Sequence, residues 1–255
     1  MDVKFSVATS GYMAKSILES YQEDNKFMNL FLKNHRDFNS DAFLSLRDKD
    51  KYKYLKNWCD KKLKTNNFTI QYKLRNLQET WSYLTKYPLN RAVGNLFNEP
   101  NINDLFNKCE GFITLNPIIP ASRYIKYSTF DVYIGVDINT MIFRAIHELI
   151  HFIWFYKWTE YFGSDNEDEY EIKESLIYTF SEISMEILFR DIHINKIVNR
   201  LCVKENPAYD YFYQLDGKPI NVLSHIYLES NDMREYMTEG FKYWCEYYSK
   251  KVHNY

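Results

Sequence analysis

The sequence predicts an α+β protein that is predominantly α, and three observations support this class. Gly (7) and Pro (6) are scarce among the 255 residues, which favours helices with short connections. Most of the chain spaces its apolar residues at helical intervals. Two short runs rich in β-branched and aromatic residues, "GFITLNPII" at 111–119 and "TFDVYIGVD" at 129–137, predict strands.

The N-terminal part of the chain is expected to be helical. Between about Gly11 and Tyr87, charged and apolar residues alternate with helical spacing, as in "MAKSILESY" and "YLKNWCDKKL". This pattern predicts a bundle of amphipathic helices that ends near Pro88. The run "NEPNIND" at 98–104 then predicts a loop. Residues 1–104 are therefore assigned to a helical N-terminal region.

The two predicted strands lead into the most apolar helix of the chain. This helix covers at least Met141 to Trp158, with Asp137, Asn139 or Thr140 as its cap and Gly163 at its end. A second long helix is expected from about 170 to 190, after an acidic loop. We assign 105–190 to a core that holds the strands and both helices, and 191–255 to a mainly helical C-terminal subdomain.

Composition excludes several classes of protein. The 32 basic and 34 acidic residues give a net charge of −2, so we expect no nucleic-acid partner and no membrane partner. No apolar run is long enough to cross a membrane, and the N-terminus does not resemble a signal peptide, which together predict a cytoplasmic protein. The four cysteines form no CxxC pair, which argues against a zinc site built from cysteines. The oligomeric state stays open.

The stretch "RAIHELIHFIWF" places a polar stripe on this apolar helix. Arg144, His147, Glu148 and His151 fall on one narrow face, and buried ionisable groups need a partner or a metal. In a His-Glu-x-x-His pattern, two imidazoles one turn apart can bind one Zn²⁺, with the glutamate placed to take a proton from water. The alternative is an Arg144–Glu148 ion pair beside histidines that line a solvated strip.

The motif "HELIH" at 147–151, preceded by the two strands, resembles the zincin metallopeptidases over about residues 105–190. The resemblance implies a core of a small sheet, an active-site helix and a glutamate helix. It also implies one zinc ion per chain bound by His147 and His151, and hydrolysis of a peptide or protein substrate by metal-activated water with Glu148 as general base. The longer metzincin motif is excluded, because Trp154 and Lys157 replace its glycine and third histidine.

Gluzincins, the thermolysin-like and neprilysin-like zincins, take the third ligand from a following helix. Here that helix offers Glu171, Glu174, Glu182 and Glu186. Glu174 lies nearest to the apolar arc and the other three are expected to face solvent, so Glu174 is the predicted third metal ligand. "KESLIYT" also resembles the gluzincin stretch that carries this glutamate.

One departure from the thermolysin-like pattern concerns the support of a ligand histidine. Those enzymes place an Asp one turn after the ligand glutamate, where this chain has Tyr178. Support is then expected from the Tyr178 hydroxyl, from Ser175 or Ser181, or from an unidentified residue.

A looser resemblance is to the ImmA/IrrE-type metalloproteases, whose glutamate helix reads roughly E-x-x-A-x-x-F-A. Glu174, Phe180 and Ser181 keep that spacing, although Ile177 replaces the small residue. This resemblance implies a regulatory protease of narrow specificity as an alternative to a general zinc peptidase. A non-catalytic helical interaction protein with a fortuitous or structural motif is the third reading.

Thermolysin-like enzymes also stabilise the oxyanion with a His or Tyr from the C-terminal subdomain. His225, Tyr213 and Tyr227 are the candidates here, and His225 is the catalytic residue we predict. His193 is less favoured because it closely follows the glutamate helix.

Overall fold

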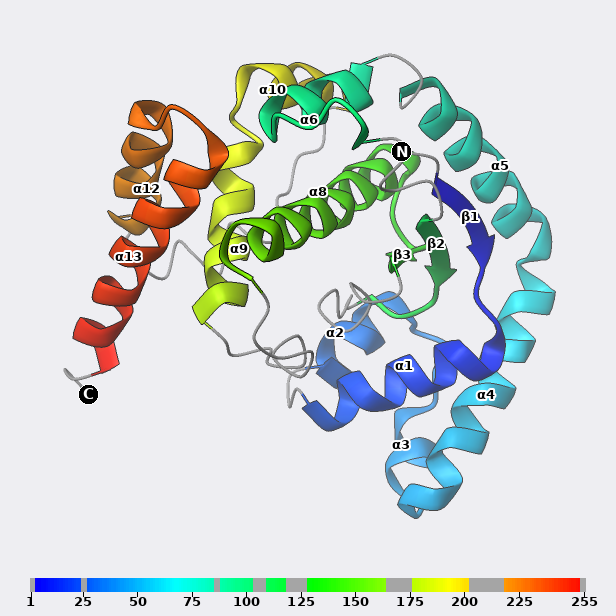
Figure 1. Ribbon diagram of the computed structural model, residues 1–255. Coiled ribbons are helices and arrows are strands. Elements are labelled where there is room, and N and C mark those ends of the chain that lie inside the picture. The colour runs from blue at the N-terminus through cyan, green and yellow to red at the C-terminus, as the bar shows by residue number, and fades with distance from the viewer. Residues whose placement is uncertain are drawn as a thin grey trace.

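The computed structural model is mostly helical with one small sheet, which confirms the predicted α+β class with predominant α structure (Figure 1). It describes residues 3–23, 27–84, 88–102, 109–117, 128–163, 176–201 and 218–252. The strands are β1 (Val3–Val7), β2 (Cys109–Thr114) and β3 (Thr129–Tyr133). The helices before β2 are α1 (Ser10–Glu23), α2 (Phe27–Asn34), α3 (Ser40–Leu44), α4 (Asp48–Thr65), α5 (Asn67–Leu84) and α6 (Asn90–Leu96). Those after β3 are α8 (Ile138–Phe162), α9 (Leu176–Leu188), α10 (Ile192–Val198), the 3₁₀ helix η4 (Asn199–Leu201), α12 (Lys218–Glu229) and α13 (Met233–Val252).

The sheet is parallel, with strand order β1-β2-β3. The predicted strands are confirmed as β2 and β3, but β1 lies in the range expected to be helical. In β1, Val3 and Phe5 are buried and Lys4 is exposed, the alternation of a half-buried strand. Five residues are too few for this period to stand out, and β1 is fixed by pairing with β2, over a hundred positions away.

The two faces of the sheet pack against different groups of helices. Phe5, Ile113 and Phe130 belong to a large apolar cluster shared with α5, α8 and α9. The opposite face contributes Phe112 to a smaller cluster with α1, α2 and α4. Gly111 keeps the first face tight, because a Cβ there would lie 2.6 Å from the Phe5 ring. The sheet is therefore covered on both faces, as expected for parallel strands.

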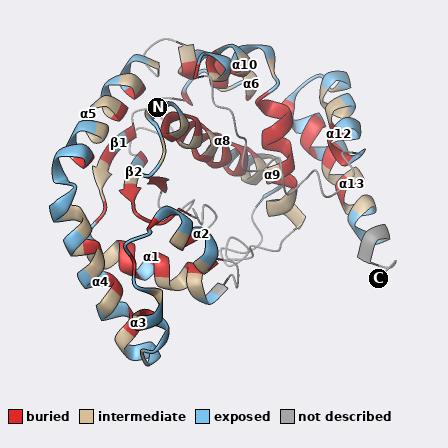
Figure 2. Cartoon of the chain, turned by 180° about the vertical axis from the view of Figure 1, so that it is seen from behind, coloured by how far each residue is buried: buried red, intermediate tan, exposed pale blue. Residues whose placement is uncertain are grey.

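Helix α8 runs through the large cluster and is buried along most of its length (Figure 2). It packs against β3, α5, α9 and α13. The large cluster contains residues of all three predicted ranges, from Val3 to Trp244, so these ranges share one core. The boundaries at residues 104 and 190 stay predictions.

Among the described helices, none combines the length and the apolar character that a membrane span requires.

Candidate metal centre

Both ends of α8 are fixed by local interactions that the sequence predicts. The Asp137 carboxylate caps the first turn by accepting a hydrogen bond from the Thr140 backbone N–H at 3.0 Å. The helix ends at Gly163, whose φ of +78° is a conformation that favours glycine. Between these ends the helix carries His147, Glu148 and His151 into the core.

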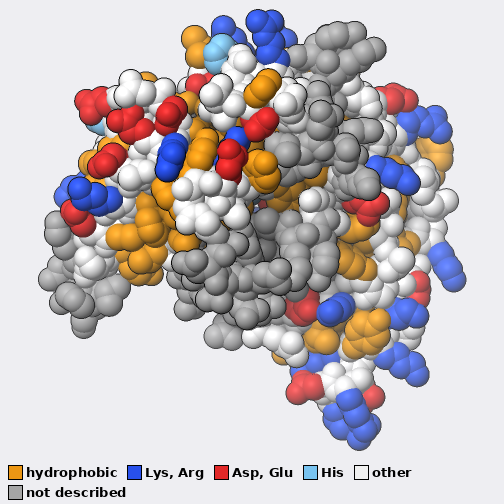
Figure 3. All heavy atoms as spheres, viewed as in Figure 1, with side chains coloured by type: hydrophobic (Ala, Val, Ile, Leu, Met, Phe, Trp, Pro, Cys, Tyr) orange, Lys and Arg blue, Asp and Glu red, His pale blue; other side chains and the backbone are white. Residues whose placement is uncertain are grey.

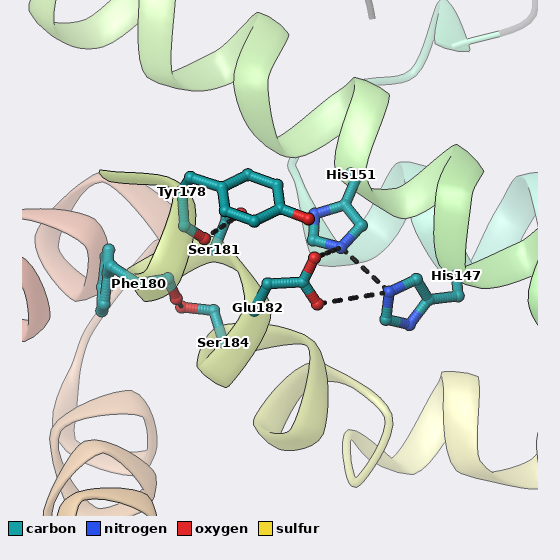
Figure 4. Close-up of polar contacts among 7 residues, drawn as sticks. All are labelled: His147, His151, Tyr178, Phe180, Ser181, Glu182 and Ser184. Atoms are coloured by element: carbon teal, nitrogen blue, oxygen red, sulfur yellow. Dashed lines mark hydrogen bonds and ion pairs between the residues drawn. The ribbon is translucent and has the colours of Figure 1, made fainter. Parts of the chain in front are cut away.

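The two histidines point toward the same position, one turn apart on α8 (Figure 4). Their Nε2 atoms lie 3.0 Å apart. The side chain of His151 is 2% exposed and that of His147 is 15% exposed. Phe189 stacks on the His147 ring and Phe155 on the His151 ring, at centroid distances of 5.9 and 6.2 Å. Apolar contacts therefore hold both rings in place.

Glu182 of α9 brings a carboxylate to this pair of histidines (Figure 4). Its Oε1 lies 3.4 Å from Nε2 of His151, and its Oε2 lies 3.6 Å from Nε2 of His147. In the part of the chain that the structure describes, this is the one group of three His, Cys, Asp or Glu residues whose donor atoms come together in this way.

The expectation that Glu182 and Glu186 face solvent is wrong. The side chain of Glu182 is 19% exposed and Glu186 is 3% exposed. The apolar arc of α9 underestimates its buried surface, because the helix packs against α8, α12 and α13 together. Polar residues such as Ser181 and Ser184 are buried on it as well.

The three side chains fit a tetrahedral zinc ion. Zinc bonds of about 2.0–2.2 Å to imidazole nitrogen and carboxylate oxygen place neighbouring ligand atoms roughly 3.3–3.5 Å apart. The two Nε2 atoms lie 3.0 Å apart, and the Glu182 carboxylate approaches them to 3.4 Å with Oε1 and to 3.6 Å with Oε2, separations close to that value. Two histidines and one glutamate are also a ligand set of catalytic zinc sites.

The charge state of Glu182 suits a metal ligand. Burial alone would raise the pKa of its carboxyl, but the nearby imidazoles of His151 and His147 outweigh it, so the pKa falls well below its ordinary value. The group is therefore ionised in the folded protein, as metal binding requires.

Glu148 is the second buried carboxyl group at this site. It is 5% exposed, and its Oε2 is buried with no hydrogen-bond partner among the described residues. Burial raises the pKa of Glu148 to about 8, with Glu182 and Asp131 adding to the rise, while His147 and Arg144 oppose it. A carboxyl group that titrates near neutrality can both accept and return a proton.

Tyr178 and Glu186 flank Glu182 by one turn on either side. Burial raises the pKa of the Tyr178 hydroxyl and the Glu182 carboxylate adds to the rise, so the two groups interact. That this hydroxyl supports a ligand histidine stays a prediction. The Ser181 hydroxyl gives no such support, because it donates to the Tyr178 backbone oxygen at 2.7 Å. Burial raises the pKa of Glu186, and the charges of Arg190 and His147 lower it in part.

Several predicted site residues lie elsewhere or outside the described residues. Glu174, Glu171, Ser175 and Tyr213 fall outside them, so the prediction that Glu174 binds the metal stays a prediction. His225 is exposed on α12 and makes no hydrogen bond or ion pair with a described residue. The Tyr227 hydroxyl donates to Asp191 at 3.0 Å, at the start of α10, and His193 is exposed on the same helix.

Comparisons with protein-family models, with curated proteins and with solved structures gave no match for this chain.

Proposed function

We propose that this chain is a zinc-dependent peptidase in which His147, His151 and Glu182 bind the metal and Glu148 is the general base. The observation that carries the proposal is the convergence of these three donor groups from α8 and α9 beside a buried, hydrogen-bond-deficient Glu148. Among the described residues three donors come together, which leaves a fourth position for water or substrate and favours a catalytic site over a structural site with four protein ligands.

Zinc bound by these ligands supplies Lewis-acid activation of water and of a carbonyl oxygen. Glu148 supplies the proton transfer. Its carboxyl adjoins His147 in sequence, and its Oε2 has an acceptor lone pair free of protein donors among the described residues. The carboxylate takes a proton from the attacking water, and the resulting acid delivers it to the amine that leaves.

With Glu182 as the third ligand, the chain also keeps part of the gluzincin pattern. Thermolysin-like enzymes carry an acidic residue one turn after the ligand glutamate. Counted from Glu174 that position is Tyr178, but counted from Glu182 it is Glu186, a buried carboxyl group whose charge interacts with that of His147. We therefore assign Glu186 the role of orienting His147.

The first test is hydrolysis of a mixed peptide library by the zinc-loaded full-length chain, with cleavage products identified by mass spectrometry. We expect cleavage that a chelator abolishes and that Glu148→Gln reduces by about two to four orders of magnitude, as expected for loss of a general base. Glu239→Gln, at an exposed position of α13, is the matched control and should leave the rate unchanged.

Two other outcomes have defined meanings. Cleavage confined to one or a few sequences, still dependent on Glu148, would identify the narrow-specificity regulatory protease. Zinc binding without any hydrolysis that depends on Glu148 would contradict the peptidase and indicate a structural metal in an interaction protein.

A further inference from the structure

Positive charge is concentrated on α4 and α5, far out of proportion to the whole chain. Residues 47–75 contain ten Lys and Arg against three Asp and Glu, a local net charge of +7 in a protein whose net charge is −2. The expectation of no membrane partner rested on the net charge, which does not describe this surface. Figure 3 shows Lys and Arg side chains along the right-hand edge and lower tip of the molecule, where α5 and α4 lie in Figure 1.

Much of this charge is free of protein partners. Lys51 and Lys62 form ion pairs with Asp48 and Asp37, and Lys73 donates to backbone oxygens of the loop that follows β3. Arg47 pairs with Asp50 at 3.0 Å, and the remaining six are exposed and form no ion pair with any described residue. We call this set the basic arc: Lys49, Lys53, Lys56, Lys61, Lys64 and Arg75.

Helices α4 and α5 follow one another along the outer rim of the molecule (Figures 1 and 2). Helical hydrogen bonding continues through the joint, because the Asn66 N–H donates to Lys62 O and the Ile70 N–H donates to Asn66 O. Lys64 therefore lies about one turn before Phe68. The helices present one long outward surface rather than two separate faces.

Aromatic side chains stand on the same surface. Phe68 is 86% exposed and Tyr72, one turn further along α5, is 60% exposed. Phe68, Tyr72 and Arg75 have the i, i+4, i+7 spacing of a single helix face. An apolar ring that is almost fully exposed has no stabilising role within this chain, and it lies beside the lysines of the α4 end.

We propose that the basic arc, with Phe68 and Tyr72, docks this protein on an anionic lipid surface. Clustered lysines are attracted to acidic headgroups, and their aliphatic stems, like aromatic rings, enter the boundary between headgroups and acyl chains. The complementarity of charge and the exposed Phe68 ring together select this partner. The docking does not depend on the proposed peptidase activity.

A nucleic acid accounts for these features less well. Proteins that bind single strands stack bases on aromatic rings inside a basic groove, and arginine is the favoured phosphate ligand. Here the rings stand on an outer helical surface, and eight of the ten basic residues in 47–75 are Lys.

The test is co-sedimentation of the full-length chain with vesicles of phosphatidylcholine alone and of phosphatidylcholine with phosphatidylserine. We expect binding to the anionic vesicles at low salt that is at least about tenfold stronger than to neutral vesicles, and that weakens as salt is added. The variant Lys56→Glu/Lys61→Glu/Lys64→Glu should lose this binding. Phe68→Ser/Tyr72→Ser should weaken it several-fold while leaving its dependence on salt intact.

Matched controls separate the basic arc from general effects of charge and apolar surface. Lys196→Glu/Lys218→Glu/Lys242→Glu makes the same charge change at exposed positions of α10, α12 and α13, and Leu228→Ser removes a 77%-exposed apolar side chain from α12. Both should bind like the wild type, and circular dichroism checks that every variant is folded.

Three results would overturn the proposal. The first is no preference of the wild type for anionic vesicles, and the second is binding that the test and control lysine variants reduce equally. The third is tighter binding of the wild type to a single-stranded oligonucleotide than to the anionic vesicles, with the binding to the oligonucleotide lost in the test lysine variant.

Discussion

The Glu182 carboxylate lies 3.4 Å from Nε2 of His151, so that a contact joins helices α8 and α9. This contact gives a reason for the polar stripe on α8. His151 and Glu148 are buried where uncompensated ionisable groups are costly, and the carboxylate of α9 partners the histidines. A metal ion bound between them would complete the compensation.

Tyr178→Phe tests the support of Glu182. The substitution removes the hydroxyl that interacts with the Glu182 carboxylate and leaves the ring in place. We expect zinc affinity to fall by about 10- to 100-fold, because groups that orient a ligand have effects of this size. Competition with a chromogenic chelator measures the affinity. Tyr227→Phe, which loses a hydroxyl bonded to Asp191 instead, is the control, and equal affinities in both variants would refute the role.

The substitution Lys157→Met tests how much the buried ion pair near the C-terminal end of α8 stabilises the fold. The Lys157 ammonium group donates to Glu99 and to Glu160, each at 2.8 Å, and its side chain is 5% exposed. Lys157→Met removes the cation from the 15%-exposed Glu99 carboxylate and should lower the free energy of unfolding by about 3 kcal/mol, measured with urea. Adding Glu99→Gln should recover part of the loss; a double variant as unstable as the sum of both single variants would contradict this.

The ion pair between Lys157 and Glu99 also makes the stability of the fold depend on pH in the acid range. The hydrogen bond from Lys157 lowers the pKa of Glu99 below its ordinary value of 4.5. The pair therefore stabilises the fold above that value and loses its effect as the pH falls through the lower, folded-state pKa. The difference in stability between wild type and Lys157→Met should shrink on acidification, and a constant difference would count against the ion pair.

The buried His35 makes the stability of the fold depend on pH in a milder range, below pH 6.5. It is 6% exposed, and a ring nitrogen bonds the Leu115 backbone oxygen at 2.8 Å. Burial lowers the pKa of His35 below its ordinary 6.5, so under acid conditions the unfolded chain takes up a proton that the folded chain does not. Stability should therefore fall as the pH drops below 6.5.

His35→Gln isolates this effect, because the amide can still donate to Leu115. Urea unfolding at a series of pH values should show a shallower loss of stability below pH 6.5 in His35→Gln than in the wild type. The exposed His193→Gln serves as the control and should retain the wild-type slope. Identical slopes in all three proteins would refute the assignment.

The sequence predicted α8, a cap at Asp137, Asn139 or Thr140, an end at Gly163 and the strands β2 and β3, because each depends on local spacing or capping; the cap is Asp137. It missed β1, whose five residues become a strand through pairing with β2. The histidines and Glu148 were found because one helix carries them at a fixed spacing.

Glu182 was missed for a physical reason. Ranking the carboxylates of α9 by distance from the apolar arc assumes that buried faces are apolar, and this fails where a helix packs on several sides around a polar centre. Glu182 and Glu186, the two charged residues of α9 and one turn apart, were the available signal. They repeat on α9 the spacing of His147 and His151 on α8.

The most direct test of the central claim is the zinc content of the purified full-length chain, measured by mass spectrometry beside Glu182→Gln and Glu174→Gln. We expect about one zinc per chain in the wild type and in Glu174→Gln, and little or none in Glu182→Gln. His147→Ala should lose zinc as well. Zinc retained in Glu182→Gln but lost in Glu174→Gln would assign the third ligand to Glu174, and no zinc in the wild type after incubation with zinc would contradict the metal centre itself.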